Sequence, residues 1–218
     1  MAEEMLTVTR SLREGSALKR AAVLGAAREL FATEGFERTS MDAVALRAQV
    51  SKRTVYDYFG DKRTLLLAVI EDVAQSLLDA IRLAIQAHLS DDAGIDDPVS
   101  LEAGLVGFAT QISSSTIGSS DYAALMKLLT TEGAGLSELR DHPLFSAPED
   151  AMAERFAHFT LVGLLDAPDA RLAADHFNAL AFLLVQNNQG ALSSSGAIDV
   201  RQTIADGVHA FMRAYTPR

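Results

Sequence analysis

The chain has 218 residues, of which 49% are hydrophobic and 22% are charged, a balance that supports a packed core and excludes an intrinsically disordered protein. It contains no cysteine, which excludes a disulfide framework and a thiolate metal site. The formal net charge of −10 is unevenly distributed, because residues 1–63 hold 11 Lys/Arg and 9 Asp/Glu whereas residues 64–218 hold 8 and 20. A basic segment on an acidic body is typical of a nucleic-acid reader with a second function elsewhere.

The N-terminus and the apolar runs bear on the compartment. The first ten residues carry acids where a signal peptide carries bases, and no apolar h-region follows them. The longest apolar runs, such as residues 179–185, are far shorter than the roughly 18 residues that a membrane-spanning helix needs. We therefore expect a soluble, cytoplasmic protein with no membrane partner.

The N-terminal part of the chain is predicted to form a tail and four helices. Residues 1–16 are mixed and polar, so we expect a flexible tail. The next segment has apolar residues at helical spacing and is followed by Gly35, a residue type that often follows a helix end. Thr39, Ser51 and Asp61 each have the side chain of an N-cap residue. The predicted helices span residues 17–34, 39–48, 51–59 and 61–88.

The rest of the chain is predicted to form helices separated by polar segments. Residues 90–100 are an acidic linker, and the Ser/Gly-rich stretches 113–120 and 190–197 are expected to be loops. Residues 133–147 are expected to form turns with one short helix. No segment alternates polar and apolar residues over a convincing length, so the predicted fold class is all-α. The expected helices span residues 101–112, 122–132, 148–165, 168–188 and 199–215.

Residues 39–59 have the layout of a helix-turn-helix, with two short helices joined by a tight turn. Val55 and Phe59 share the inner face of the second helix, since they are four positions apart. Lysine and arginine can bind phosphates or guanine edges, threonine can touch a thymine methyl, and tyrosine can donate to a phosphate. The alternative for these side chains is a solvated surface. The outer side of this helix carries Lys52, Arg53, Thr54 and Tyr56.

A close resemblance to the DNA-binding domain of TetR-family transcriptional regulators lies in the stretch RAAVLGAARELFATEGFERTSMDAVALRAQVSKRTVYDYFGDKRTLL. It covers about residues 19–66, and the remainder matches the family in size, helical character and helix order. Two positions depart from the family pattern, which usually has glycine at Gln49 and often leucine at Val55. A glutamine in the left-handed conformation that such a glycine often adopts costs roughly 1 kcal/mol or more. The matching positions are Phe31, Gly35, Thr39, Val50, Ser51, Thr54, Val55, Tyr56, Tyr58, Phe59 and Lys62.

The resemblance implies a division of the chain and a way of working. The expected parts are a tail at 1–16, a helix-turn-helix DNA-binding domain at 17–66, and a helical ligand-binding and dimerisation domain at 67–218. Members of this family are homodimers through their last two helices, usually repress, and leave a palindromic operator when a small molecule binds. The implied DNA-binding residues are Thr39, Arg47, Ser51, Lys52, Arg53, Thr54, Tyr56 and Lys62.

The ligand implied by the resemblance is expected to be a mostly apolar small molecule. Aromatic side chains of the C-terminal part more often belong to the hydrophobic core, and the resemblance implies that some of them line the ligand cavity. The candidate ligand-binding residues are Phe108, Gln111, Tyr122, Phe156, His158, Phe159 and Phe177, with Asn178 as a further polar group.

Several side chains have a second interpretation that stays open. Thr39 and Ser51 can act as N-caps first, with a phosphate contact as a second use of the hydroxyl. Arg47 can bind a phosphate or pair with a neighbouring acid. Tyr58 is expected to pack inward and is left out of the DNA contacts. The apolar faces of the last two helices can be intrachain core or partner contacts.

Catalysis and cofactors are not expected. The five histidines form no HxxxH or HExxH pair, and no GxSxG, P-loop or GxGxxG motif is present. We therefore expect no metal, no cofactor and no enzymatic activity. The alternative function is a small-molecule-binding helical protein without regulatory DNA binding, and the third possibility is an enzyme on an all-α scaffold.

Overall fold

The computed structural model describes residues 2–117, 119–132, 142–183, 185 and 199–217. These residues form helices and no strands, which confirms the predicted all-α fold. Contacts divide the chain into two compact units: residues 1–74 and 120–140, here the N-terminal unit, and residues 75–119 and 141–218, here the C-terminal unit. In the described part of the chain, none of the helices has the length and apolarity needed to cross a bilayer.

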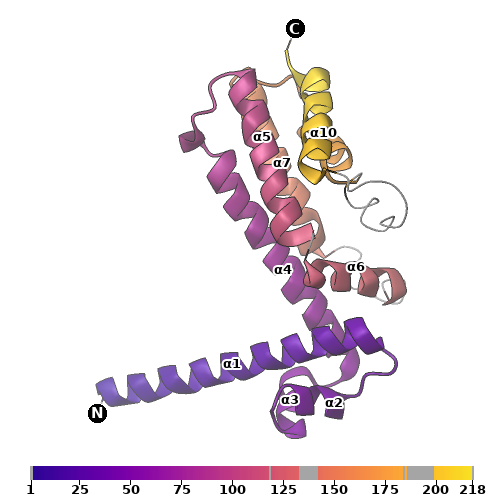
Figure 1. Ribbon diagram of the computed structural model, residues 1–218. Coiled ribbons are helices and arrows are strands. Elements are labelled where there is room, and N and C mark those ends of the chain that lie inside the picture. The colour runs from indigo at the N-terminus through magenta and orange to yellow at the C-terminus, as the bar shows by residue number, and fades with distance from the viewer. Residues whose placement is uncertain (1, 118, 133–141, 184, 186–198, 218) are drawn as a thin grey trace. The chain divides into compact units, whose positions relative to one another are not determined.

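The N-terminal unit begins with a long helix, α1 (Ala2–Glu34), shown in indigo in Figure 1. Residues 2–16, expected to form a flexible tail, are helical in the structure. Residues 2–14 contain neither glycine nor proline, so nothing in that stretch interrupts a helix. The predicted end of the helix is confirmed, because Gly35 has a φ of 89° and its N–H donates to the Phe31 carbonyl at 3.1 Å.

Two short helices, α2 (Met41–Arg47) and α3 (Lys52–Phe59), confirm the predicted helix-turn-helix. The N-cap of α2 is Ser40, whose hydroxyl accepts the Ala43 N–H at 3.1 Å, so the prediction that Thr39 caps this helix is wrong. Thr39 is only 2% exposed, and its hydroxyl donates to the Gly35 carbonyl at 2.8 Å. It therefore supports the loop between α1 and α2 from within.

The next helix, α4 (Lys62–His88), is capped as predicted by Asp61. The Asp61 carboxylate accepts the Thr64 N–H at 2.8 Å, and this hydrogen bond lowers the pKa of the carboxyl group. The N-terminal unit also contains α6 (Ser120–Glu132), from which Lys127 donates to the Ala32 carbonyl of α1 at 2.7 Å. This segment lies inside the range 67–218 that the sequence assigns to ligand binding, so the compact units follow different boundaries from the expected functional domains.

The C-terminal unit contains residues 75–88 of α4, the 3-10 turn η1 (Asp91–Ala93) and helix α5 (Pro98–Ile112). Asp97 and Ser100 form a capping box at the start of α5. Both residues belong to the stretch 90–100 that was expected to be a linker, so α5 begins earlier than predicted. The stretch 113–120 was expected to be a loop, but its first residues form a π-helical turn, η2 (Ser113–Ile117). The Ser115 hydroxyl donates to the Gln111 carbonyl at 2.7 Å, which shows how serine side chains bond to this irregular backbone.

Helix α7 (Pro143–Leu161) starts earlier than the predicted Pro148. His142 is its N-cap and Pro143 takes the first position, where a missing N–H leaves no bond unmade, so Pro148 lies inside the helix. The helix ends at Leu161, before the predicted residue 165, and Gly163 turns the chain with a φ of 80°. Residues 133–141 of the expected turn region lie outside the described residues.

The unit is completed by α8 (Ala170–Asn178), the π-helical turn η5 (Ala179–Leu183) and α10 (Val200–Tyr215). The helix expected over 168–188 begins at Ala170, is α-helical to Asn178 and continues as the π-helical turn η5 to Leu183. The expected loop 190–197 lies outside the described residues. The last helix is confirmed. It packs closely on η5, because a Cβ at Gly207 would lie 2.8 Å from the Leu180 carbonyl carbon.

Aromatic rings form the centre of the C-terminal unit. Phe156 of α7 stacks on Phe211 of α10 with centroids 5.1 Å apart. Phe177 of α8 meets both rings edge-on, at 5.6 and 5.4 Å. Phe108 of α5 adds a fourth buried ring 6.1 Å from Phe177. These contacts connect four helices through one hydrophobic cluster.

The C-terminal end of α4 lies very close to α5. A Cβ at Gly107 would be 2.6 Å from His88 Nδ1, and a Cβ at Gly104 would be 2.7 Å from the His88 carbonyl oxygen. The His88 ring also forms a hydrogen bond from Nε2 to Gln111 Oε1 at 2.9 Å. Only glycine fits at residues 104 and 107 while His88 holds this position.

Candidate functional site

The exposed side of α3 is the candidate DNA-reading surface. Ser51 caps the helix, because its hydroxyl accepts the Thr54 N–H at 3.0 Å. Val55 and Phe59 are buried, as predicted, and this turns the opposite side of the helix toward solvent. The side chains presented there are Lys52, Arg53 and Tyr56, which are exposed, and Thr54, which is half-buried.

The two bases of α3 are each held by an exposed carboxylate. Lys52 Nζ lies 2.8 Å from Asp42 Oδ1, and the hydrogen bond to Asp42 raises the pKa of the lysine. Arg53 Nε lies 3.6 Å from Asp57 Oδ2, while 89% of the arginine side chain is exposed. Exposed ion pairs of this kind contribute little to stability. Both bases can therefore exchange a carboxylate for a DNA phosphate at little cost.

The turn before α3 contains a residue in an unfavourable conformation. Gln49 has a φ of 56°, the only positive value at a non-glycine position in the described residues. This is the left-handed region, which glycine enters without a steric penalty. The N–H of Gln49 donates to the Leu46 carbonyl at 3.2 Å, and that of Val50 to the Ala45 carbonyl at 3.0 Å. The turn thus keeps a left-handed corner although it lacks the usual glycine.

Lys62, expected at a phosphate, is bonded within the N-terminal unit. Its Nζ donates to the Phe36 carbonyl at 2.9 Å and to the Glu37 carbonyl at 3.1 Å. The same nitrogen lies 4.4 Å from the centroid of the Phe36 ring. These contacts join the first turn of α4 to the loop after α1. A lysine ammonium has three N–H donors, so these two bonds leave one donor for an outside acceptor.

Two further predicted DNA contacts are engaged elsewhere. The Arg47 guanidinium forms a two-point ion pair with Glu29, with Nε 3.0 Å from Oε2, and this hydrogen bond raises the pKa of the arginine. This is the pairing with a neighbouring acid that the sequence left open. Thr39 is buried, as described above. Either side chain would have to rearrange to contact a phosphate.

Tyr58 packs on the inner side of α3, as expected. Its hydroxyl donates to the Ser16 carbonyl of α1 at 3.1 Å and lies 2.8 Å from the Ser16 hydroxyl. Ser16 was not predicted to have a role, because nothing in the local sequence signals a partner that lies 42 residues away. The contact fixes α1 against the helix that carries the candidate surface.

The predicted ligand-binding residues are not gathered in one place. Phe108, Phe156 and Phe177 belong to the packed aromatic cluster, and Gln111 is bonded to His88. Tyr122 lies in α6 of the N-terminal unit. His158 and Phe159, two members of the predicted set, line a hollow in the C-terminal unit.

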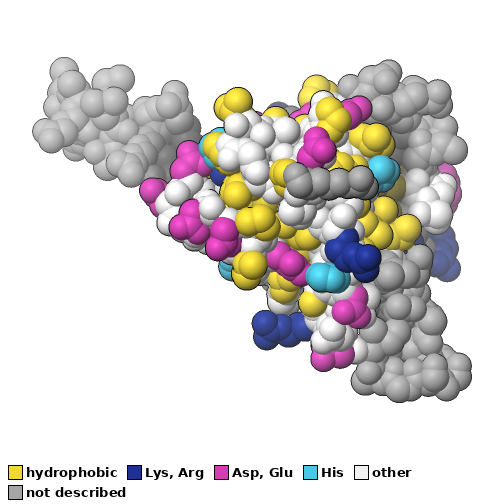
Figure 2. All heavy atoms as spheres, turned by 90° about the horizontal axis from the view of Figure 1, so that it is seen from above, with side chains coloured by type: hydrophobic (Ala, Val, Ile, Leu, Met, Phe, Trp, Pro, Cys, Tyr) yellow, Lys and Arg dark blue, Asp and Glu magenta, His cyan; other side chains and the backbone are white. Residues whose placement is uncertain are grey.

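That hollow, here the α7 groove, has a volume of about 280 Å³ and lies where η1 meets the end of α7. Figure 2 shows exposed hydrophobic side chains between acidic, basic and histidine side chains on the face that it views. In the described residues, no group of three or more His, Cys, Asp or Glu side chains is placed to hold a metal ion. Besides His158 and Phe159, the residues that line the α7 groove include Asp91, Ile95, Arg155, Val162 and Leu164.

Two protein-family models match the chain. The model described as "Bacterial regulatory proteins, tetR family" matches residues 23–69, which include α2 and α3. The model described as "AefR-like transcriptional repressor, C-terminal domain" matches residues 103–217, which include α7, α8 and α10.

Individual proteins with similar sequence or structure are also regulators. The HTH-type transcriptional activator FasR of Mycolicibacterium smegmatis is 37% identical over 68 residues, so the match spans 31% of this chain and 31% of FasR. A TetR-family regulator from Mesorhizobium loti has a similar structure, with a TM-score of 0.79 at 24% identity over 93% of this chain and 98% of that chain. The flavonoid-responsive regulator FrrA aligns with a TM-score of 0.70 at 27% identity, over 92% of this chain and 98% of that chain.

Proposed function

The chain belongs to the tetR family of bacterial regulatory proteins and is a transcription regulator, and from this premise we propose that it is a dimeric, ligand-responsive repressor. Membership of a family of regulators agrees with the expectation that the chain is not an enzyme. The proposal that the chain binds DNA is supported by the two sides of α3. One side is buried and contains Val55 and Phe59, and the other is exposed and contains Lys52 and Arg53. A helix of this kind enters the major groove, and its exposed side meets the DNA.

Within the proposed complex, each side chain of α3 has a role that follows from its chemistry. Arg53 is the proposed base reader, since a guanidinium can bond a guanine edge at two points and this one is largely exposed. Lys52 and Tyr56 are the proposed phosphate contacts, and Ser51 and Thr54, at the start of α3, are proposed to lie near the DNA backbone. Lys62 adds a phosphate contact through its remaining donor. Thr39 and Arg47 stay predictions that need a rearrangement.

The proposed dimer forms through the last two helices, as the family resemblance implies. Large apolar side chains are exposed on these elements, namely Leu172 of α8, Leu183 of η5 and Val200 of α10. A two-fold symmetric dimer presents two copies of α3, so the operator is expected to be palindromic.

Repression and a mostly apolar effector are supported by the relatives. The family model over residues 103–217 is named for a repressor, whereas FasR, an activator, matches 68 residues. FrrA responds to flavonoids, which supports an effector with an aromatic body. A reporter gene placed behind the operator tests the sign: its expression should fall when the regulator is produced, and a rise would make the protein an activator.

The experiment that tests DNA binding is selection of DNA from a random pool by the purified chain at near-physiological salt. We expect enrichment of a two-fold symmetric site. Arg53→Ala should then relax the preference at one base position in each half-site. Arg82→Ala is the matched control, because Arg82 is an exposed arginine on α4 that pairs within its own helix with Asp79 at 3.8 Å.

Failure to enrich any sequence from folded protein would contradict the proposal. The alternative, a small-molecule-binding helical protein without regulatory DNA binding, would then be favoured. If Arg53→Ala lowers the affinity for all DNA sequences equally, the proposed regulator is still supported, and Arg53 contacts a phosphate rather than a base.

A further inference from the structure

The α7 groove has features of a small-molecule site that DNA binding does not use. Its volume of about 280 Å³ is close to the lower end of the roughly 300–1,000 Å³ that is usual for ligand pockets, so it fits a small ligand. Its lining combines apolar side chains with charged ones. The groups that matter for the argument are Ile95, Phe159 and Leu164 on the apolar part, and Asp91, Arg155 and His158 on the polar part.

Arg155 is placed to hold a ligand. Its guanidinium carbon lies 5.0 Å from the centroid of the Phe159 ring, and this contact orients the guanidinium plane. One terminal nitrogen donates to Asp91 Oδ1 at 3.0 Å, whereas the buried Nε has no hydrogen-bond partner in the described residues. A guanidinium presents a fork of donors that can hold a carboxylate at two points. Here the fork is used at one point.

Asp91 marks where a carboxylate is held. Its Oδ1 also lies 3.5 Å from His158 Nε2, so one carboxylate oxygen faces two basic side chains. The Asp91 side chain is nevertheless 73% exposed and stands on the three-residue turn η1, so its displacement costs little. A carboxylate from outside could take the same place and rest its apolar part on Ile95 and Phe159.

We propose that the α7 groove binds a small organic acid, whose carboxylate replaces that of Asp91 on Arg155 and His158 while its apolar body lies against Phe159. The inference rests on the proposed function for the regulatory meaning of the ligand and deepens it by naming a chemical class of effector. The competing role of the Arg155–Asp91 pair is to fasten η1 to α7, and that role predicts no affinity for acids.

The test uses the full chain with phenylacetate as the probe and phenylacetamide as its neutral counterpart, in calorimetric titration or ligand-observed NMR. Phenylacetate is expected to bind, and the amide is expected to bind at least about tenfold more weakly, since it cannot form the charge-assisted pair with Arg155. Equal affinity for the two compounds would overturn the proposal.

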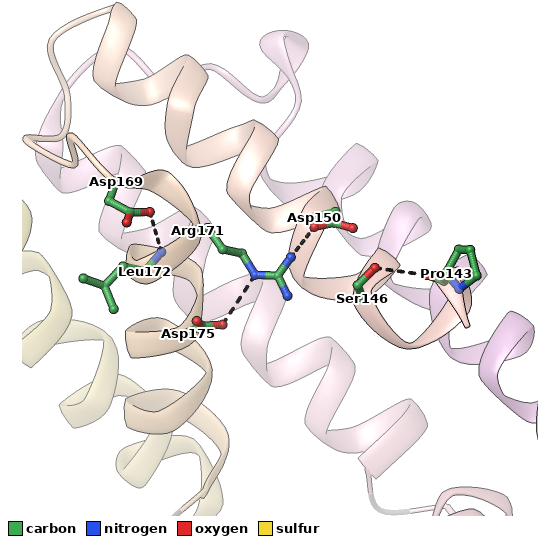
Figure 3. Close-up of polar contacts among 7 residues, drawn as sticks. All are labelled: Pro143, Ser146, Asp150, Asp169, Arg171, Leu172 and Asp175. Atoms are coloured by element: carbon green, nitrogen blue, oxygen red, sulfur yellow. Dashed lines mark hydrogen bonds and ion pairs between the residues drawn. The ribbon is translucent and has the colours of Figure 1, made fainter. Parts of the chain in front are cut away.

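Three variants locate the binding. Arg155→Met should weaken phenylacetate at least about tenfold. Arg171→Met is the control. Arg171 pairs with Asp150, and its Nε lies 3.7 Å from Asp175 Oδ1 (Figure 3). None of these three residues is among those that line the groove. Asp91→Asn should strengthen phenylacetate severalfold, because it removes the carboxylate that competes for Arg155, and it tests the proposal even if Arg155→Met does not fold.

The outcomes separate this inference from the proposed function. An Arg171→Met loss equal to that of Arg155→Met, or an Asp91→Asn variant with unchanged or weaker affinity, would overturn the organic-acid site. DNA selection that succeeds in a chain without affinity for phenylacetate would overturn this inference alone. If the chain binds phenylacetate but selects no DNA, the organic-acid site is supported and the proposed DNA-binding function is contradicted.

Discussion

Replacing Gln49 by glycine is expected to stabilise the N-terminal unit, because Gln49 holds a φ of 56° in the left-handed region. A residue with a Cβ is roughly 1–2 kcal/mol less stable there than in the right-handed region. Glycine removes this strain but loses more backbone entropy on folding, roughly 0.5–1 kcal/mol. The Gln49 side chain is exposed, so its removal leaves no cavity. The expected net gain is about 0.5–1 kcal/mol in the free energy of unfolding.

Urea unfolding followed by tyrosine fluorescence measures this gain, since three of the four tyrosines lie in the N-terminal unit. With a slope of about 2 kcal/mol per molar urea, the midpoint should rise by about 0.2–0.5 M. Gln49→Ala is the control, because alanine shortens the side chain and keeps the strain. A glycine variant with a midpoint at or below that of the wild type, or an alanine variant that gains as much as glycine, would refute the reasoning.

Three further changes test other parts of the structure. Lys62→Ala should lower the urea midpoint, because the Phe36 and Glu37 carbonyls lose their donor. The slope of log K for DNA binding against log salt concentration should become shallower by about one unit, and an unchanged slope in a filter-binding titration would show that Lys62 contacts no phosphate. Gly207→Ala should destabilise the C-terminal unit by about 1–3 kcal/mol, because the new Cβ would meet the backbone of Leu180; a thermal melt that matches wild type would contradict the close packing. Burial raises the pKa of Glu149, so the folded chain binds a proton on this carboxyl group more tightly than the unfolded chain does, and the ionised carboxylate lowers the stability at neutral pH. Glu149→Gln should therefore raise the melting temperature at neutral pH, with the gain disappearing below about pH 4, and a gain that is constant with pH would contradict it.

Helix ends were predictable where one residue decides them. The roles of Gly35, Ser51 and Asp61 at helix ends follow from the local sequence, because a left-handed glycine and an N-cap side chain act on the backbone beside them. The prediction that Thr39 caps α2 is wrong because the next residue, Ser40, carries the same kind of hydroxyl and is the N-cap. Only packing decides which of the two hydroxyls is buried. The prediction that α7 begins at Pro148 is wrong, because Pro143 is an equally suitable first residue of a helix and α7 begins there.

The candidate site was predictable only in its local part. The two sides of α3 follow from the spacing of Val55 and Phe59 within one helix. The bonds of Lys62 to the loop after α1 and of Arg155 to Asp91 join residues 25 or more positions apart, and no periodicity encodes them. The aromatic residues were placed on the correct helices, but composition could not tell a packed cluster from a lined cavity.

The contact of His88 with α5 limits how the C-terminal unit can change shape. The two glycines remove the side chains that would keep the helices apart, and the bond to Gln111 closes the contact at one end. Sliding α4 along α5 toward Gln111 would move the His88 imidazole away from Gly107 and against the side chain of Gln111. The end of α4 and the second half of α5 are therefore expected to move as one rigid body, and any rearrangement that preserves this contact must move both helices together.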